Sequence, residues 1–205
     1  MMSEPKFLLE LFSGTGSVGR PWREAGHRVD SVDLDSRYNP EECEDILEWD
    51  YRRLDTQPPD VIWASVPCEN YSIARTRAKT PRNYTLADSL VAKPIEIIKH
   101  FQGLNPDIIW FVENPDSSQL WSRAVAWDLY PRVRLDYCQY GKPWRKRTRI
   151  VSCGLDLSPL GRRCQGGHKH FILCGGAGIP YTRLAEPYPA RLCKEWAILL
   201  APLRR

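Results

Sequence analysis

The stretch Phe7-Leu8-Leu9-Glu10-Leu11-Phe12-Ser13-Gly14-Thr15-Gly16 decides the fold of this 205-residue chain. Its apolar first half has the length of a buried strand. Its glycines precede a segment that we expect to be a helix through Ala25, closed by Gly26. A strand, a glycine loop and a helix open the sheet of nucleotide-binding α/β proteins, where glycine lets the backbone approach a ligand closely. An ordinary glycine turn is the alternative interpretation.

Acidic side chains follow the glycine loop at positions where such sheets hold a nucleotide. We expect a second strand over Arg28–Leu34, with Asp33 and Asp35 at its end. An acid at the end of the second strand binds ribose hydroxyls, although Asp35 could instead cap the following turn. Asp45 opens a third short segment, and its carboxylate could accept a hydrogen bond from an adenine amine.

A thiol lies at the end of the next predicted strand. The apolar run Val61–Ala64 leads to Pro67 and Cys68, and Pro67 stiffens the chain there because its ring holds φ. Cys68 is therefore a candidate nucleophile, and a buried, inert cysteine is the alternative. The following basic residues are candidates for phosphate contacts: Arg75, Arg77 and Lys79.

A carboxylate lies at the end of a further predicted strand. We expect a helix over Leu86–Phe101, kinked at Pro94, and then a strand over Asp107–Val112 that leads to Glu113. A carboxylate at the carboxyl edge of an open α/β sheet faces the ligand, whereas a strand-end glutamate in solvent is the alternative. The pattern of Val133–Tyr137 predicts one more strand.

Positive charge is concentrated in the last third of the chain. Residues 141–205 carry 13 Lys and Arg against 3 Asp and Glu, whereas the whole chain has a net charge of +4. The segment Tyr140–Ile150 interleaves basic with aromatic side chains, which is typical of a nucleic-acid contact. Arg145 and Lys146 are candidates for that contact. A solvated basic tail is the alternative interpretation.

Composition indicates one globular domain with room for a small appendage. Hydrophobic residues make up 42% of the chain, which is typical of a folded protein. No apolar run approaches the ~18 residues that a membrane helix needs, and the first residues show no signal-peptide pattern. The seven cysteines are scattered, which argues against a disulfide framework. We therefore expect an intracellular, reducing location: the cytoplasm of a bacterial host, or the nucleus or cytoplasm if the source is eukaryotic or viral.

Two cysteines and two histidines lie close together in the basic third. Cys164, His168, His170 and Cys174 could form a tetrahedral zinc site that replaces a hydrophobic core in this region. Cys153 could supply one of the ligands instead. The spacing differs from that of ordinary zinc fingers. A basic DNA-facing loop with apolar cysteines is the alternative interpretation.

Taken in order, these motifs resemble those of the cytosine-C5 DNA methyltransferases. Glu10–Gly16 resembles the first S-adenosylmethionine motif of that family, and Pro67-Cys68 resembles its nucleophile motif. Glu113-Asn114 resembles its catalytic pair, and Arg147-Thr148-Arg149 resembles its Arg-x-Arg motif. The resemblance is close over residues 7–150 and loose beyond them. The short, virus- or phage-like branch, with its reduced target-recognition region, fits best.

The resemblance implies an α/β fold, a doubly wound Rossmann-like sheet with a small basic C-terminal appendage. It implies a catalytic domain over residues 1–150, a basic recognition region over 151–185, and a C-terminal helix within 186–205 that returns to the catalytic domain. Glu69 and Arg145 depart from the family pattern, which has glutamine at both positions. Because few residues follow the Arg-x-Arg motif, a separate partner is a candidate for recognising the target sequence.

The resemblance also implies a reaction. The thiolate of Cys68 would add to C6 of a cytosine flipped out of double-stranded DNA, and Glu113 would hold the proton at ring N3. Arg149 would bind O2 of the ring, and Arg147 would support the site. Positive neighbours would have to lower the pKa of the thiol, and the candidates are Arg75, Arg77, Arg147 and Arg149.

A cofactor and two alternatives complete what the resemblance implies. S-adenosylmethionine would supply the methyl group. Its candidate ligands are Phe12, Ser13, Gly14, Thr15, Gly16, Asp33, Asp45 and Pro67. Methylation of cytosine in RNA is one alternative, because basic patches do not distinguish RNA from DNA. A catalytically silent DNA-binding module with the same fold is the other.

Overall fold

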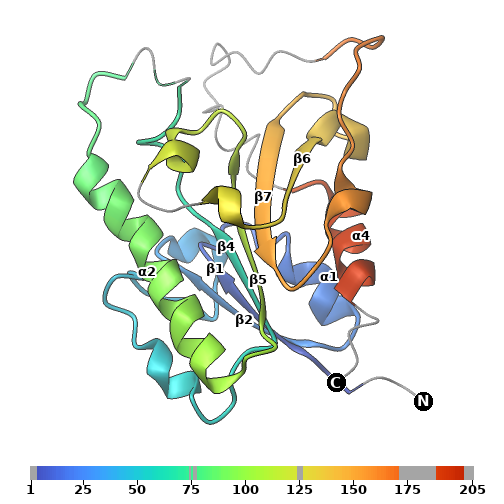
Figure 1. The fold of residues 1–205 in the computed structure, drawn as a ribbon. Helices are drawn as coiled ribbons and strands as arrows, with labels where there is room; N and C mark the ends of the chain where they lie inside the picture. Colours follow the sequence, from blue (N-terminus) through green and yellow to red (C-terminus); the bar gives the residue numbers. More distant parts are fainter. Residues whose placement is uncertain (1–3, 74, 76–77, 124–126, 171–187, 201–205) are drawn as a thin grey trace.

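A seven-stranded mixed sheet forms the centre of the molecule in the computed structural model of the chain (Figure 1). The structure describes residues 4–73, 75, 78–123, 127–170 and 188–200. The strand order is β3-β2-β1-β4-β5-β7-β6. The strands are β1 (Phe7–Leu11), β2 (Arg28–Asp33), β3 (Glu42–Cys43), β4 (Val61–Ser65), β5 (Ile109–Pro115), β6 (Arg132–Asp136) and β7 (Arg147–Cys153).

Strands β1 to β5 run parallel, and β7 runs antiparallel to both of its neighbours, β5 and β6. All five residues of β1 are buried, as expected for a parallel strand that is covered on both faces. Leu9 and Leu11 pack on one side of the sheet, and Leu8 packs on the other. The α/β prediction is confirmed.

Helices cover both faces of the sheet (Figure 1). Helix α2 (Tyr84–Leu104) packs on one face through apolar residues that include Ile97 and Phe101. Helices α1 (Gly19–Glu24) and α4 (Ala190–Leu200) pack on the other face, where α4 contacts α1. Trp196 of α4 is buried among three other aromatic rings, those of Trp22, Trp63 and Phe111.

The helices and loops differ in detail from the sequence-based expectations. Helix α1 begins only at Gly19, because turns occupy the preceding glycine loop. Helix α2 starts two residues early because Asn83 caps it, with its side-chain oxygen accepting a hydrogen bond from Leu86 N at 3.0 Å. The helix then continues through Pro94.

The short segment expected at Asp45 is a turn. The carboxylate of Asp45 accepts a hydrogen bond from Leu47 N at 3.0 Å. The third strand, β3, lies just before it. Strand β7 crosses residue 150, so the domain boundary suggested there falls inside a strand.

The topology brings the carboxyl ends of β4 and β5 and the start of β7 to one edge of the sheet. Ser65 pairs with Glu113 across β4 and β5, and Glu113 also pairs with Ile150 of β7. Glu113 therefore belongs to β5. The apolar pattern had suggested that the strand ends at Val112, one residue earlier. Within the described ranges, no helix is long and apolar enough to cross a membrane.

Candidate active site

The loop that carries Cys68 is fixed to β5 by an amide. Asn114 Nδ2 donates a hydrogen bond of 2.7 Å to the carbonyl oxygen of Val66, and the side chain of Asn114 is buried. The carbonyl oxygen of Cys68 then accepts hydrogen bonds from Tyr71 N at 3.0 Å and from Ser72 N at 2.8 Å. These contacts form a tight turn, so the position of the thiol is set by the sheet and not by a long free loop.

Lys146, Glu113 and Cys68 form the charged centre of this edge. Lys146 Nζ lies 3.7 Å from Oε1 of Glu113, whose side chain is only 6% exposed. The ammonium group also lies 5.0 Å from the ring centroid of Tyr137 and 5.8 Å from that of Tyr188. Lys146 interacts electrostatically with Cys68 as well. A residue that the sequence suggested as a phosphate contact is thus part of the candidate site.

The pKa of the Cys68 thiol is raised and not lowered. Burial is the largest cause, because a thiolate loses its hydration there. The positive charge of Lys146 offsets part of this effect, and the charge of Glu113 adds to it. The raised pKa contradicts the expectation that arginines lower it, and among the described residues the cation that acts on the thiol is Lys146.

Lys146 immediately precedes β7, and the alternation of side chains along this extended segment separates it from the two arginines of the Arg-x-Arg motif. Side chains i and i+2 of a strand share a face, so Lys146 shares its face with Thr148 and Ile150, and Ile150 pairs with Glu113. Arg147 and Arg149 point to the opposite face.

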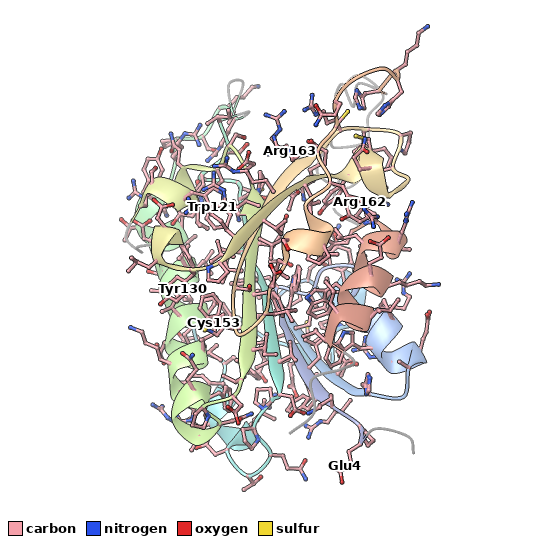
Figure 2. All side chains as sticks on the ribbon, turned by 45° about the vertical axis from the view of Figure 1, so that its right-hand side comes forward. Glu4, Trp121, Tyr130, Cys153, Arg162 and Arg163 are labelled. Atoms are coloured by element: carbon pink, nitrogen blue, oxygen red, sulfur yellow. The ribbon has the colours of Figure 1, made fainter. Side chains whose placement is uncertain are left out.

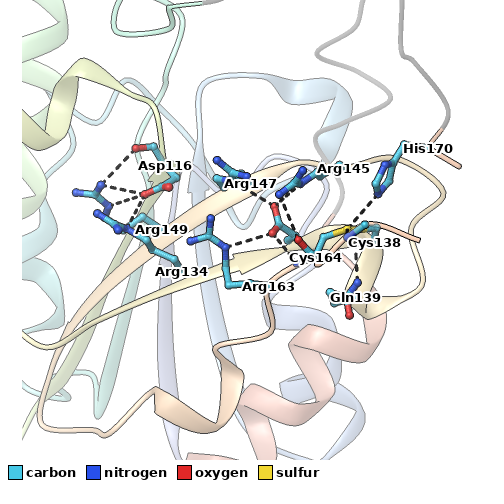
Figure 3. A network of polar contacts seen from close by, with 12 residues as sticks. Asp116, Arg134, Cys138, Gln139, Arg145, Arg147, Arg149, Arg163, Cys164 and His170 are labelled. Carbon is cyan, nitrogen blue, oxygen red and sulfur yellow. Dashed lines mark hydrogen bonds and ion pairs between the residues drawn. The ribbon is translucent and has the colours of Figure 1, made fainter. Parts of the chain in front are cut away.

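Arg149 and Arg147 each pair with an aspartate on that opposite face (Figure 3). Arg149 Nη2 lies 2.9 Å from Asp116 Oδ1, and its guanidinium lies 5.0 Å from the ring centroid of Trp121. Arg147 Nε lies 3.5 Å from Asp136 Oδ1. The structure therefore brings Cys68 and Glu113 together but joins neither arginine to them by a hydrogen bond or ion pair within the described residues.

The glycine loop is attached to β2 through Asp33. Asp33 Oδ2 accepts a hydrogen bond from Gly14 N at 2.8 Å, and Oδ1 accepts one from Asp35 N at 2.9 Å. Asp35 itself caps the turn that follows, as the alternative interpretation proposed. Gly14 and Gly16 have φ values of 49° and 62°, a left-handed conformation that favours glycine.

The other residues of the glycine loop also have a defined backbone conformation or hydrogen bonds. Phe12 has a φ of 56°, a strained conformation for a bulky residue that is common at ligand sites. Ser13 N donates to the carbonyl oxygen of Val32 at 3.2 Å. The hydroxyls of Thr15 and Ser17 lie 2.6 Å apart.

Glu10 is a buried carboxyl group at the start of the motif Glu10–Gly16, and the sequence indicated no separate role for it. Its Oε2 accepts a hydrogen bond from Gly19 N at 3.0 Å. Burial raises the pKa of Glu10 to about 7, and the hydrogen bond to Gly19 opposes that rise. A Cβ at position 19 would lie 2.5 Å from Glu10 Oε2 and 2.7 Å from Val29 Cγ1. Gly19 is therefore required by close packing.

The remaining candidates for nucleic-acid contact differ in exposure and pairing. Arg75 donates to Asn70 Oδ1 at 2.8 Å and also contacts Thr80. Lys79 is exposed. Arg145 Nε lies 3.2 Å from Asp136 Oδ1. Arg77 lies outside the described residues.

The basic segment after β7 is attached to the body of the molecule. Arg162 and Arg163 lie in this segment (Figure 2). Arg162 binds Glu195 of α4, with Nη1 2.8 Å from Oε1, and Arg163 Nε lies 3.2 Å from Asp136 Oδ2. Further along, Cys164 Sγ lies 3.9 Å from His168 Nε2 and 3.5 Å from His170 Nε2. Cys174 lies outside the described residues.

Two residues near the candidate site, Tyr188 and Asp116, belong to none of the motifs found in the sequence. The hydroxyl of Tyr188 lies 2.9 Å from Ser65 Oγ, although the two residues are 123 positions apart. Asp116 holds both Arg149 and Arg134, and only its position two residues after Asn114 could have pointed to it.

Comparison with known proteins gives one close relative in sequence. The chain is 35% identical over 157 residues to a protein of Frog virus 3 (isolate Goorha) described as a probable DNA (cytosine-5)-methyltransferase, and the match covers 70% of this chain and 68% of that protein. No family model matches the chain.

A solved structure shows the same fold. The chain resembles the crystal structure of the Dnmt2 methyltransferase of S. pombe with a TM-score of 0.51 at 15% sequence identity. The match covers 82% of this chain and 59% of that protein, so the chain spans less than two thirds of its length. A Spodoptera frugiperda DNMT2 mutant aligns with a TM-score of 0.47 at 18% identity, over 82% of this chain and 56% of that one.

Proposed function

This chain belongs to the cytosine-5 methyltransferase family, and we propose that it transfers a methyl group from S-adenosylmethionine to C5 of cytosine in DNA. The observation that carries the proposal is the convergence of Cys68 and Glu113 beside Lys146 at one edge of the sheet. The description of the viral relative as a probable DNA (cytosine-5)-methyltransferase supports DNA as the substrate.

The chemistry of cytosine explains why a thiol and a carboxyl group are needed together. C5 of cytosine is a poor nucleophile, and addition of the Cys68 thiolate to C6 turns C5 into an enamine-like carbon. Electron density moves to ring N3 during that addition, and Glu113 supplies a proton there. C5 then takes the methyl group that bound S-adenosylmethionine would supply. Water or another base takes the C5 proton, Glu113 takes back the proton from N3, and expulsion of the Cys68 thiolate restores the aromatic ring. Lys146 stabilises both anionic side chains of this cycle, the thiolate and the carboxylate.

The glycine loop is the proposed cofactor site. Bound S-adenosylmethionine supplies an electrophilic methyl group on a sulfonium centre. The residues fit this cofactor because Gly14 and Gly16 keep the backbone free of side chains in a left-handed turn, while Asp33 places a carboxylate at the end of β2. The other proposed ligands are Phe12, Ser13, Thr15, Asp45 and Pro67.

Double-stranded DNA is the proposed partner, with the target cytosine flipped out at a cost of about a few kcal/mol. Arg75, Lys79 and Arg145 are proposed phosphate contacts. We keep Arg147 and Arg149 as proposed contacts of the target nucleotide, and their ion pairs with Asp136 and Asp116 would have to open first. A separate partner that recognises the target sequence remains part of the proposal.

Covalent trapping tests this function. The full chain is incubated with S-adenosylmethionine and a long duplex in which 5-fluorocytosine replaces cytosine, so that an unknown target sequence is present. Fluorine at C5 cannot leave as a proton does, and we expect an adduct that survives denaturation. Cys68→Ser should abolish the adduct. Cys43→Ser changes an exposed cysteine on the outermost strand β3, which β2 and β1 separate from β4, and should keep the adduct.

Three other outcomes decide between the alternatives. An adduct with 5-fluorocytosine RNA and none with DNA would replace the substrate by RNA. Binding of S-adenosylmethionine without any adduct would support the silent DNA-binding module. An adduct that persists in Cys68→Ser would overturn the assignment of the nucleophile.

A further inference from the structure

Four metal-binding side chains come together beside the start of β7, and three of them, Cys164, His168 and His170, are among those that the sequence suggested. Their ligand atoms, from Cys138, Cys164, His168 and His170, all lie within 4.8 Å of one another. Cys138 belongs to the 3-10 helix η5 (Tyr137–Tyr140) and is 26 positions from Cys164. Cys153 is not in this cluster. It packs against the hydrophobic core between the sheet and α2.

The distances suit a tetrahedral metal ion. Zn–S bonds of ~2.3 Å and Zn–N bonds of ~2.0 Å place the ligand atoms of a tetrahedral site about 3.3–3.8 Å apart. Cys164 Sγ is 3.5 Å from His170 Nε2 and 3.9 Å from His168 Nε2. The two imidazole rings lie edge to face, with their centroids 4.4 Å apart. Small adjustments of side-chain torsions would therefore bring all four atoms to bonding distance.

From this geometry we propose that the protein binds one zinc ion through Cys138, Cys164, His168 and His170. Two sulfur and two nitrogen ligands form a closed site without a position for substrate, which is the arrangement of structural zinc. The proposal stands whether or not the protein transfers methyl groups.

The surroundings of Cys164 support a metal-bound thiolate. Asp136 Oδ2 accepts a hydrogen bond from Cys164 N at 2.9 Å, and Gly166 N donates to Cys164 Sγ at 3.4 Å. Arg145 Nη2 contacts the carbonyl oxygen of Cys164 at 3.5 Å (Figure 3). Such hydrogen bonds to first ligands orient them and increase metal affinity. Gly166 has a φ of 90°, which lets the chain turn back so that the histidines face Cys164.

The ion would connect two parts of the chain that border the candidate active site. Residue Tyr137 of η5 contacts Lys146, and Asp136 next to it pairs with Arg145, Arg147 and Arg163. The metal would therefore fix the basic segment around residue 164 to the strand that begins at Arg147. This region lacks a large core of its own, and metal binding supplies folding free energy in such cases.

Metal analysis of the full chain tests the proposal. The protein is purified under reducing conditions, dialysed against metal-free buffer without chelator, and analysed by mass spectrometry for zinc. We expect about one zinc per chain, and at least a fivefold lower content in Cys138→Ser and in His168→Ala. Cys174→Ser and Cys153→Ser should retain the wild-type content. Loss of zinc in Cys174→Ser with retention in Cys138→Ser would overturn the ligand set.

Alkylation of the wild-type chain provides a second measurement that does not depend on the folding of a variant. Zinc should protect Cys138 and Cys164 from iodoacetamide, and a strong chelator should expose both, while the labelling of Cys43 stays unchanged. A wild-type chain that contains less than a tenth of an equivalent of zinc after expression with added zinc would overturn the proposal. A Cys138–Cys164 disulfide in the reduced preparation would overturn it as well.

Discussion

Lys146 Nζ lies 3.7 Å from Glu113 Oε1, and the two side chains are 20% and 6% exposed. Burial would by itself lower the pKa of Lys146, but its interactions with Tyr137, Glu113 and Cys68 raise it above the ordinary value. Lys146 is therefore charged at neutral pH. The cation that neutralises this edge of the sheet comes from the residue before the Arg-x-Arg motif, and four predictions follow from this site and from the packing behind it.

Replacement of Lys146 by Met should move the titration of Cys68 to higher pH. The thiolate is the reactive form, and its pKa is already raised by burial. Loss of the neighbouring positive charge removes the effect that opposes burial, so the midpoint should move to higher pH. The measurement is the rate of iodoacetamide labelling at Cys68 as a function of pH. Lys146→Arg should stay near wild type, and so should Lys79→Met, which changes an exposed lysine. An unchanged midpoint in Lys146→Met would contradict the coupling.

Replacement of Glu113 by Gln should slow methyl transfer without weakening cofactor binding. The amide has the same shape but cannot supply a proton, and removal of a general acid typically costs about 10²–10⁴-fold in rate. Single-turnover transfer of labelled methyl groups gives the rate, and calorimetry gives the affinity for S-adenosylmethionine. Glu69→Gln is the matched control, because Glu69 is exposed and lies next to Cys68. A loss of less than threefold in Glu113→Gln would remove the proposed proton donor.

Replacement of Glu10 by Gln should change how stability depends on pH. The pKa of Glu10 is raised to about 7 in the folded state by burial, whereas an unfolded glutamate titrates near ~4.3. The folded protein therefore binds more protons than the unfolded one between these values, and the free energy of unfolding falls as pH rises through that window. The full loss is roughly 4 kcal/mol.

Urea unfolding at pH 5 and at pH 8 measures this effect. The stability of Glu10→Gln relative to wild type should increase by about 2–3 kcal/mol between the two conditions. Glu24→Gln, at the exposed end of α1, should run parallel to wild type. Parallel curves for Glu10→Gln and wild type would mean that the carboxyl group is already ionised at pH 5.

Replacement of Trp196 by Ala should strongly destabilise the protein, because this ring is 2% exposed and packs on Trp63 with centroids 4.8 Å apart. Removal of a buried tryptophan typically costs about 3–5 kcal/mol. Ile198→Ala lies on the same helix with its side chain 68% exposed, so its cost should be within about 0.5 kcal/mol. Chemical denaturation compares the two variants. Equal losses would mean that α4 does not pack as described.

Local sequence pattern was sufficient for most of the fold. The apolar run at Phe7–Leu11 and the glycines after it predict a strand and a tight turn because both depend on neighbouring residues alone. The ends of elements were less predictable. Helix α2 begins early because Asn83 caps it, and β5 extends through Glu113 because Ser65 and Ile150 provide strand partners on both sides. Helix caps and neighbouring strands fix the ends of an element through contacts, and the local hydrophobic pattern does not contain those contacts.

The residues of the candidate site divide in the same way. Their types and order along the chain could be read directly, and that order was enough to indicate the family. The face on which each β7 side chain lies depends on the register of β7 against β5. Lys146, just before β7, contacts Glu113, whereas Arg149 lies on the opposite face and pairs with Asp116. The meeting of Cys138 with Cys164 likewise depends on how η5 folds against the segment after β7. Such relationships come from long-range pairing, because a shift of one residue along a strand reverses every side chain.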